Sequence, residues 1–274
     1  MSDQNNVSSP EMLDFLKSPV KDMPAISSLK KKLSIFIPLF LLEIVIAIFC
    51  GGIISQLTNG LHLMEGNKLE HFFSDYPVWV VFIYVALAGP MLEELLFRLS
   101  LRLNEKYVQL NVVLMLTGLM FILVSSIKIF IIQVSLITIE IILLSIYFAG
   151  KELFNKYILS IWDRKYIWVF YLSAAIFGLL HISNYNPKFL TFLLMPILVL
   201  PQFIVGLFCG YIRIRLGFFW GYFFHASHNF VFIIPLLLTP LIINPVNKSV
   251  EITEHDNHNK YTIQVPRIGF NKLN

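Results

Sequence analysis

The sequence consists largely of apolar runs that are long enough to cross a lipid bilayer. The first run covers residues 33–54, and its 22 residues exceed the length of about 20 that a hydrocarbon core of about 30 Å requires. Hydrophobic residues make up 57% of the chain and charged residues 14%, whereas a soluble domain usually carries about 25% charged residues. This composition excludes a soluble enzyme, a disordered protein and a nucleic-acid binder with a basic face. It predicts an all-α, polytopic transmembrane helical bundle.

Hydropathy predicts about seven spans, with a polar segment on either side of them. Residues 1–29 are interpreted as a loose, polar cytoplasmic tail, residues 30–245 as the transmembrane helical domain, and residues 246–274 as a polar C-terminal tail. Gly89-Pro90 predicts a kink in the second span, and Pro196 and Pro201 predict breaks in the sixth. The expected spans cover residues 33–54, 77–104, 108–124, 127–149, 166–182, 189–212 and 218–243.

Basic residues gather at alternate ends of these spans. The ends on the side of the N-terminus carry most of them: Lys17, Lys21, Lys30, Lys31, Lys32, Arg102, Lys106, Lys151, Lys156, Arg164, Lys165, Arg213 and Arg215. The short loops on the other side carry Lys68, Lys128 and Lys188. Because Lys and Arg are enriched in cytoplasmic loops, this asymmetry predicts a multi-pass protein of the cell (plasma) membrane with a cytoplasmic N-terminus. Both cysteines lie in apolar runs, so a disulfide framework is not expected.

Ionisable side chains inside spans are costly and therefore mark candidate sites. The densest group is Glu93-Glu94-Leu-Leu-Phe-Arg98. Glu94 and Arg98 are four residues apart, so they share a helix face and are expected to pair. Glu93 lies about 100° around the helix and remains free to act as a general base. A purely structural ion pair is the alternative interpretation.

Two further groups come from later spans. Phe177 and His181 lie one helical turn apart near the end of a short span, and His225 and Asn229 share one face of the last span. His228 could compete with His225, and polar contacts between helices are the alternative role for both groups. Glu43 and Glu140 also lie within spans but have no partner in the local sequence.

Depth in the membrane relates the three groups. At about 1.5 Å per residue, measured from the cytoplasmic ends of their spans, Glu93, His181, His225 and Asn229 fall within about 12 Å of one another. This estimate requires an even number of spans between the first and second groups, and an inserted helical hairpin at residues 108–150 satisfies it. The sequence therefore predicts a single shared site.

In this order, EExxxR at Glu93-Glu94 and Arg98, FxxxH at Phe177 and His181, and HxxxN at His225 and Asn229 resemble the motifs of the CPBP family. This family comprises the CAAX prenyl endopeptidase and bacterial relatives described as Abi or bacteriocin-processing membrane proteases. The resemblance covers about residues 77–235. Many relatives have a shorter segment between the first two motifs, where the hairpin is expected here.

The resemblance implies an intramembrane endopeptidase with a membrane-associated peptide or protein as substrate. Its catalytic residues would be Glu93, Glu94, Arg98, His181, His225 and Asn229. Glu93 and His181 would activate a water, His225 and Asn229 would stabilise the oxyanion, and Arg98 would orient the glutamate pair. A Zn²⁺ or other divalent metal is possible on Glu93, His181 and His225, although no HExxH helix is present and a metal-free mechanism is favoured.

Two other functions fit the same residues. A non-catalytic immunity or scaffold protein of this fold would use the polar groups to bind a membrane partner. A proton-coupled transporter would use them as a relay, but the sequence has no repeated halves. Neither composition nor motifs favour a nucleic-acid partner.

Overall fold

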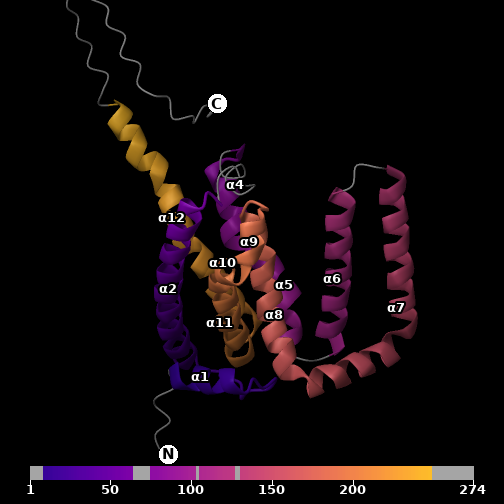
Figure 1. Ribbon diagram of the computed structural model, residues 1–274. Coiled ribbons are helices and arrows are strands. Elements are labelled where there is room, and N and C mark those ends of the chain that lie inside the picture. The colour runs from indigo at the N-terminus through magenta and orange to yellow at the C-terminus, as the bar shows by residue number, and fades with distance from the viewer. Residues whose placement is uncertain (1–8, 64–74, 103–104, 127–129, 249–274) are drawn as a thin grey trace, which may run out of the picture.

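The computed structural model describes residues 9–63, 75–102, 105–126 and 130–248. All of its regular elements are helices within these residues (Figure 1), which confirms the all-α fold class. In chain order they are α1 (Ser9–Lys17), α2 (Leu29–Gly60), α4 (Val78–Phe82), the π-helical turn η1 (Ile83–Ala88), α5 (Gly89–Phe97), η2 (Leu99–Leu101), α6 (Glu105–Ser126), α7 (Phe130–Arg164), α8 (Tyr166–Leu180), η3 (His181–Asn184), α9 (Phe189–Leu193), α10 (Met195–Leu198), α11 (Leu200–Leu216) and α12 (Phe218–Lys248).

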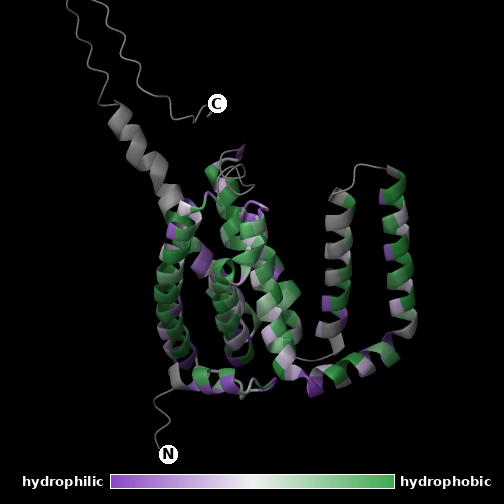
Figure 2. Cartoon of the chain, in the orientation of Figure 1, coloured by the Kyte–Doolittle hydropathy of each residue, from purple (hydrophilic) through white to green (hydrophobic). Residues whose placement is uncertain are grey.

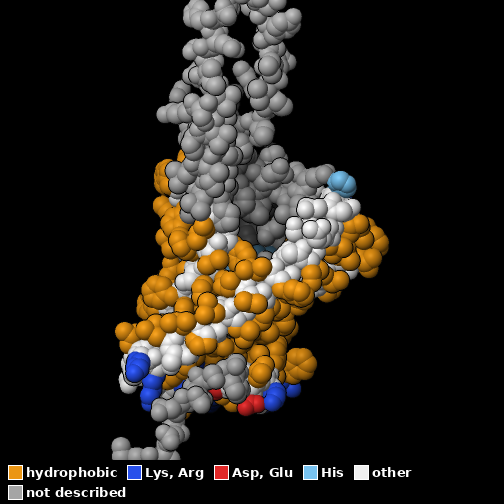
Figure 3. All heavy atoms as spheres, turned by 90° about the vertical axis from the view of Figure 1, so that its left-hand side faces the viewer, with side chains coloured by type: hydrophobic (Ala, Val, Ile, Leu, Met, Phe, Trp, Pro, Cys, Tyr) orange, Lys and Arg blue, Asp and Glu red, His pale blue; other side chains and the backbone are white. Residues whose placement is uncertain are grey.

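The outer surface of the bundle is apolar over most of its length, as a surface in contact with lipid must be. Phe49 on α2 is 69% exposed and Ile131 on α7 is 75% exposed. Figure 2 shows hydrophobic residues along the helices, and Figure 3 shows charged side chains gathered at the end next to α1. Four helical segments are long and apolar enough to cross a membrane among the described residues: Leu29–Gly60, Val78–Phe97, Ile131–Arg164 and Tyr166–Asn184. The chain is a membrane protein, and the count of about seven spans stays a prediction.

Helix α11 lies at the centre of the bundle and packs against α2, α8 and α12. Small residues allow α8 and α11 to approach closely. A Cβ atom at Gly210 would lie 2.7 Å from Cε2 of the buried Phe170, and one at Gly178 would lie 3.1 Å from the backbone nitrogen of Phe203. Such small residues replace side-chain bulk with close backbone packing in membrane bundles. Helices α6 and α7 form an antiparallel pair beside this bundle, and α7 continues past the expected end at Ala149 to Arg164 (Figure 1).

The first nine described residues depart from expectation. Ser9–Lys17 form helix α1, which lies across one end of the bundle (Figure 1), so the expectation of a loose tail is wrong for these residues. Phe15 is buried, and its ring makes edge contacts with Phe170 and Tyr211, each at 5.2 Å between centroids. Glu11 also pairs with Nε of Arg215 at 2.8 Å. Apolar burial and an ion pair thus attach α1 to α8 and α11.

The predicted kink at Gly89-Pro90 appears as a π-helical turn. The backbone N–H of Gly89 donates to the carbonyl of Tyr84, five residues back. A Cβ atom at Gly89 would lie 3.0 Å from that carbonyl oxygen, so the wide turn fits glycine best. Pro90 has no N–H to continue the pattern. Lys68, Lys128 and the C-terminal tail from residue 249 onward lie outside the described residues.

Candidate active site

One cavity of about 580 Å³ lies between α2, the η1–α5 segment, α8 with η3, α11 and α12. Its lining includes Glu93, His181, His225 and Asn229. These four residues come from three motifs that together span more than 130 positions of sequence. The structure brings them to one cavity, in agreement with the depth estimate. Glu94 and Arg98 lie behind its wall, where both side chains are fully buried.

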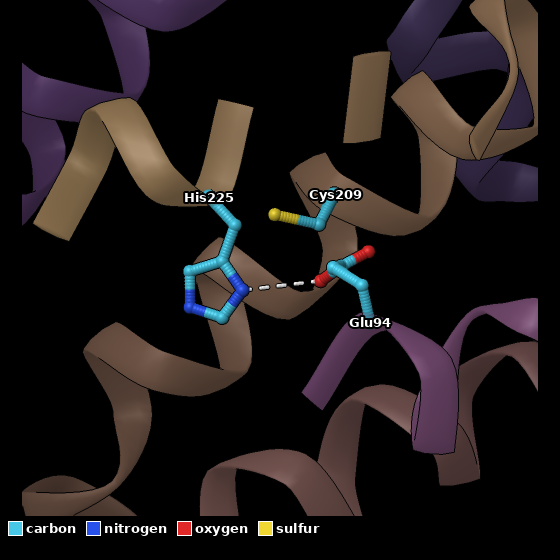
Figure 4. Close-up of side chains that lie close together, drawn as sticks. All are labelled: Glu94, Cys209 and His225. Atoms are coloured by element: carbon cyan, nitrogen blue, oxygen red, sulfur yellow. Dashed lines mark hydrogen bonds and ion pairs between the residues drawn. The ribbon is translucent and has the colours of Figure 1, made fainter. Parts of the chain in front are cut away.

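The buried Glu94 carboxylate contacts two side chains, the guanidinium of Arg98 and the imidazole of His225. Its Oε1 lies 3.6 Å from Nε of Arg98 and 3.1 Å from Nδ1 of His225. Figure 4 shows the contact between Glu94 and His225, with Cys209 beside them. The pairing of Glu94 with Arg98, predicted from their spacing, is confirmed. A buried carboxylate requires such partners because its loss of hydration is otherwise uncompensated.

Glu93 faces the cavity from the neighbouring position of α5. Its side chain is 32% exposed, whereas that of Glu94 is inaccessible. Oε2 of Glu93 lies 3.4 Å from Nε2 of His225. Glu93 was expected to share a water with His181, and its direct contact with His225 was not foreseen. His225 therefore stands between the two carboxylates, with Nδ1 toward Glu94 and Nε2 toward Glu93.

His181 lies where α8 passes into the turn η3. Its Nδ1 lies 2.9 Å from the carbonyl oxygen of Phe177, so Nδ1–H donates to the backbone. That hydrogen bond sets the tautomer in which Nε2 is the nitrogen available to the cavity. This hydrogen bond forms because Phe177 lies one helical turn before His181, and His181 directly follows the end of α8.

The ring of Phe177 packs between the three motifs. The guanidinium carbon of Arg98 lies 4.0 Å from its centroid, and the rings of His181 and His225 lie edge-on at 5.0 and 5.4 Å. A cation over an aromatic face is attracted by the ring quadrupole. Phe177 thus fixes the relative positions of Arg98 and the two imidazoles, a role that the sequence motif did not reveal.

Asn229 is held by a backbone group that the kink leaves without a helical partner. Its Nδ2 donates to the carbonyl oxygen of Val85 at 2.8 Å. Val85 lies five residues before Pro90, so the acceptor that a π-helical turn would pair with residue 90 has no N–H to meet. The kink and the HxxxN motif therefore cooperate, and one N–H of the Asn229 amide remains available.

The other ionisable side chains within the spans have different surroundings. Glu43 is fully buried and contacts His228, a partner that no local pattern indicated. Arg213 donates to the carbonyls of Arg98 and Leu99 at 3.1 and 3.3 Å and so satisfies groups where α5 ends. Glu140 on α7 does not line the cavity.

The donor geometry does not fit the metal set suggested by the motifs. Among the described residues, the three donors that come within 4.8 Å of one another belong to Glu94, Cys209 and His225, not to Glu93, His181 and His225. Arg98 already lies 3.6 Å from Glu94, so a divalent cation there would face a guanidinium charge at close range. The Glu94 group, with Arg98 beside it, is therefore poorly placed to hold a divalent cation.

Comparison with known families supports the resemblance found in the motifs. Residues 151–231 match the family model described as "Type II CAAX prenyl endopeptidase Rce1-like". The matched segment contains the FxxxH and HxxxN motifs, together with α8, α11 and the first part of α12. Searches of curated proteins and of solved structures gave no match. The match covers less than a third of the chain and agrees with the CPBP/CAAX resemblance over these residues.

Proposed function

We propose that this chain, which is similar to the type II CAAX prenyl endopeptidases over residues 151–231, is an intramembrane endopeptidase that hydrolyses a peptide bond in the cavity. The observation that carries the proposal is the convergence of Glu93, His181, His225 and Asn229 on one cavity of about 580 Å³. Membrane anchoring or partner binding does not require an acid, two imidazoles and an amide to converge on one cavity.

In the proposed reaction, a water bound between Glu93 and His181 attacks the peptide carbonyl. Glu93 takes the proton from the water, because it is the carboxylate that reaches the cavity while Glu94 is committed to Arg98 and His225. The new C–O bond places negative charge on the carbonyl oxygen. The imidazolium form of His225, which donates Nδ1–H to Glu94 and has a second N–H at Nε2, and the second N–H of Asn229 stabilise this oxyanion, an interaction that typically contributes about 10²–10³ in rate per donor.

Glu94, Arg98 and Phe177 position these groups. Glu94 holds Nδ1 of His225, which leaves Nε2 directed toward Glu93. Arg98 compensates the charge of Glu94 and stacks on Phe177. A preorganised site of this kind needs little rearrangement when charge develops. The mechanism uses no metal ion.

The substrate is a membrane-associated peptide or protein, and the protein resides in the cell membrane with its N-terminus in the cytoplasm. Support comes from the surface, where charged side chains gather at the end next to α1 and apolar side chains cover the rest of the described face (Figure 3). Cytoplasmic ends of spans are enriched in Lys and Arg.

The test compares two isosteric substitutions in the full-length protein, purified in detergent and mixed with a library of membrane peptides. Glu93→Gln removes the base from the cavity, whereas Glu140→Gln makes the same change on α7, away from the cavity. We expect mass spectrometry to find cleaved peptides with the wild type and Glu140→Gln and only a trace with Glu93→Gln. Cleavage by Glu93→Gln at a rate close to that of the wild type would contradict the proposal. Binding of a peptide without cleavage by the wild type would favour the immunity or scaffold function.

A further inference from the structure

A second acid–imidazole pair lies beside the candidate active site. Nδ1 of His228 lies 3.0 Å from both carboxylate oxygens of Glu43. The Glu43 side chain is inaccessible, and His228 is 15% exposed and lines the cavity. Glu43 and His228 are separated by 185 positions of sequence, and they belong to α2 and α12. No role in the mechanism above involves either residue.

The pair joins α2 and α12 at the cavity, whereas Glu93 reaches the cavity from α5. On α2, Glu43 begins a helical stripe that continues through Ala47, Gly51 and Ile54, and these three residues line the cavity. On α12, Asn229 contacts the η1–α5 side through Val85, whereas His228 contacts the α2 side through Glu43. A peptide in the cavity is therefore within the space lined by both Glu93 of α5 and His228 of α12.

The arrangement of His228 suits proton transfer rather than packing alone. Its Nδ1 is engaged by Glu43, and its ring packs against Phe232 at 4.8 Å between centroids. Among the described residues, Nε2 has no hydrogen-bond or ionic partner. A carboxylate that holds one imidazole nitrogen fixes the ring and its tautomer, and the other nitrogen then serves the reaction. A simple polar contact between α2 and α12 would not need a carboxylate, which is costly to bury in a membrane.

We propose that His228, oriented by Glu43, donates the proton to the leaving nitrogen when the peptide bond breaks. This inference rests on the proposed endopeptidase function and adds a catalytic residue, His228, and a positioning residue, Glu43. Two residues then transfer protons: Glu93 on α5 removes a proton from water, and His228 on α12 supplies one to the leaving amine.

The proposed steps balance as follows. Water attacks the carbonyl carbon, one C–O bond forms, and the proton of the water passes to Glu93. The C–N bond then breaks with its electron pair on nitrogen, and the His228 imidazolium gives the Nε2 proton to that nitrogen. The proton held by Glu93 returns to His228 through solvent in the cavity. One peptide and one water thus become one carboxylic acid and one amine.

The test compares two leaving groups that differ in whether they require a proton. An amine must be protonated as it leaves, whereas a thiolate, with a conjugate pKa of about 8.5, can leave without a proton. A peptide found to be cleaved by the wild type is compared with its thioester analogue, in which sulfur replaces the scissile N–H. We expect His228→Asn to lower kcat for the peptide by about 100-fold or more and to leave kcat for the thioester close to the wild-type value. Glu43→Gln should act in the same direction.

His62→Asn is the matched control, because His62 does not line the cavity and its φ of 51° is tolerated by asparagine. It should leave both reactions unchanged. Equal losses with peptide and thioester in His228→Asn, or no loss with either, would overturn the role of His228 and leave the endopeptidase proposal intact. Glu93→Gln distinguishes the two proposals, since it must strongly slow both the peptide and the thioester reaction. If His228→Asn does not elute as the folded protein, His228→Gln and Glu43→Gln decide by the same ratio of peptide to thioester rates.

Discussion

Nδ1 of His225 lies 3.1 Å from Oε1 of Glu94, and both side chains are buried. This contact joins the first motif to the third through the interior of the bundle. Arg98, 3.6 Å from the same carboxylate oxygen, compensates the charge. The candidate active site therefore depends on Glu94 and Arg98, two buried side chains that substrate does not need to touch.

Substituting Arg98 should destabilise the protein as well as impair its activity. Arg98→Met leaves the buried Glu94 carboxylate without its cation, and breaking a buried pair in this way costs about 3–5 kcal/mol. Thermal unfolding of the detergent-purified protein checks this expectation. Arg215→Met, which removes a partly exposed pair with Glu11, is the control and should have a smaller effect. Equal shifts in unfolding temperature for the two variants would contradict the interpretation.

The close approach of α8 and α11 predicts a strict size limit at Gly210. A methyl group there would lie 2.7 Å from Cε2 of Phe170, which is buried and cannot move freely. Gly210→Ala should destabilise the bundle by about 1–3 kcal/mol through overpacking. Gly150→Ala on α7 is the matched control, because its Cβ would meet nothing within 4 Å. Unchanged stability in Gly210→Ala would show that the helices separate easily.

Helix α1 should contribute to stability through its buried face. Phe15→Ala removes a ring that packs against Phe170 and Tyr211, and a buried phenylalanine contributes about 3–5 kcal/mol against alanine. Leu13→Ala tests the opposite face of the same helix, because Leu13 is 60% exposed. Urea-induced unfolding should shift for Phe15→Ala and not for Leu13→Ala. A larger shift for Leu13→Ala than for Phe15→Ala would contradict the packing of the Phe15 face of α1 against the bundle.

Spacing along a helix predicted the parts of the site that lie within one helix. The pair of Glu94 and Arg98 and the kink at Gly89-Pro90 follow from such local rules. Depth in the membrane also predicted that Glu93, His181, His225 and Asn229 would share one level, since straight spans translate residue number into depth. In a membrane protein, the position of a residue in a span is therefore described by its depth and by the rotation of its helix, and the sequence predicts the depth.

Contacts between helices were not predictable in the same way, because they depend on rotation about each helix axis. The contact of Glu93 with His225 and the pair of Glu43 with His228 both arise from such rotations. Helix α1 was missed for a different reason. Met12, Phe15 and Leu16 are spaced as one face of a helix, but this apolar face is short and acidic residues surround it, which is also typical of a polar tail.

Activity should not depend on a metal ion. The three donors of the motif-derived set do not all lie within 4.8 Å of one another, and the group of Glu94, Cys209 and His225 includes a carboxylate already paired with Arg98. Peptide cleavage should therefore persist in the presence of a chelator, and Cys209→Ala should retain activity. Loss of cleavage on chelation, with recovery on addition of Zn²⁺, would contradict this expectation.

The most direct test of the shared site is a double-mutant cycle between Glu93 and His181, which belong to α5 and the α8–η3 junction. If the two side chains act on one water, removing either one disables the same step, and losses in kcat for groups that act as a unit are strongly non-additive. We therefore predict that the Glu93→Gln, His181→Asn double variant is about as slow in peptide cleavage as the slower single variant. A double variant whose loss equals the product of the two single losses would contradict a common site.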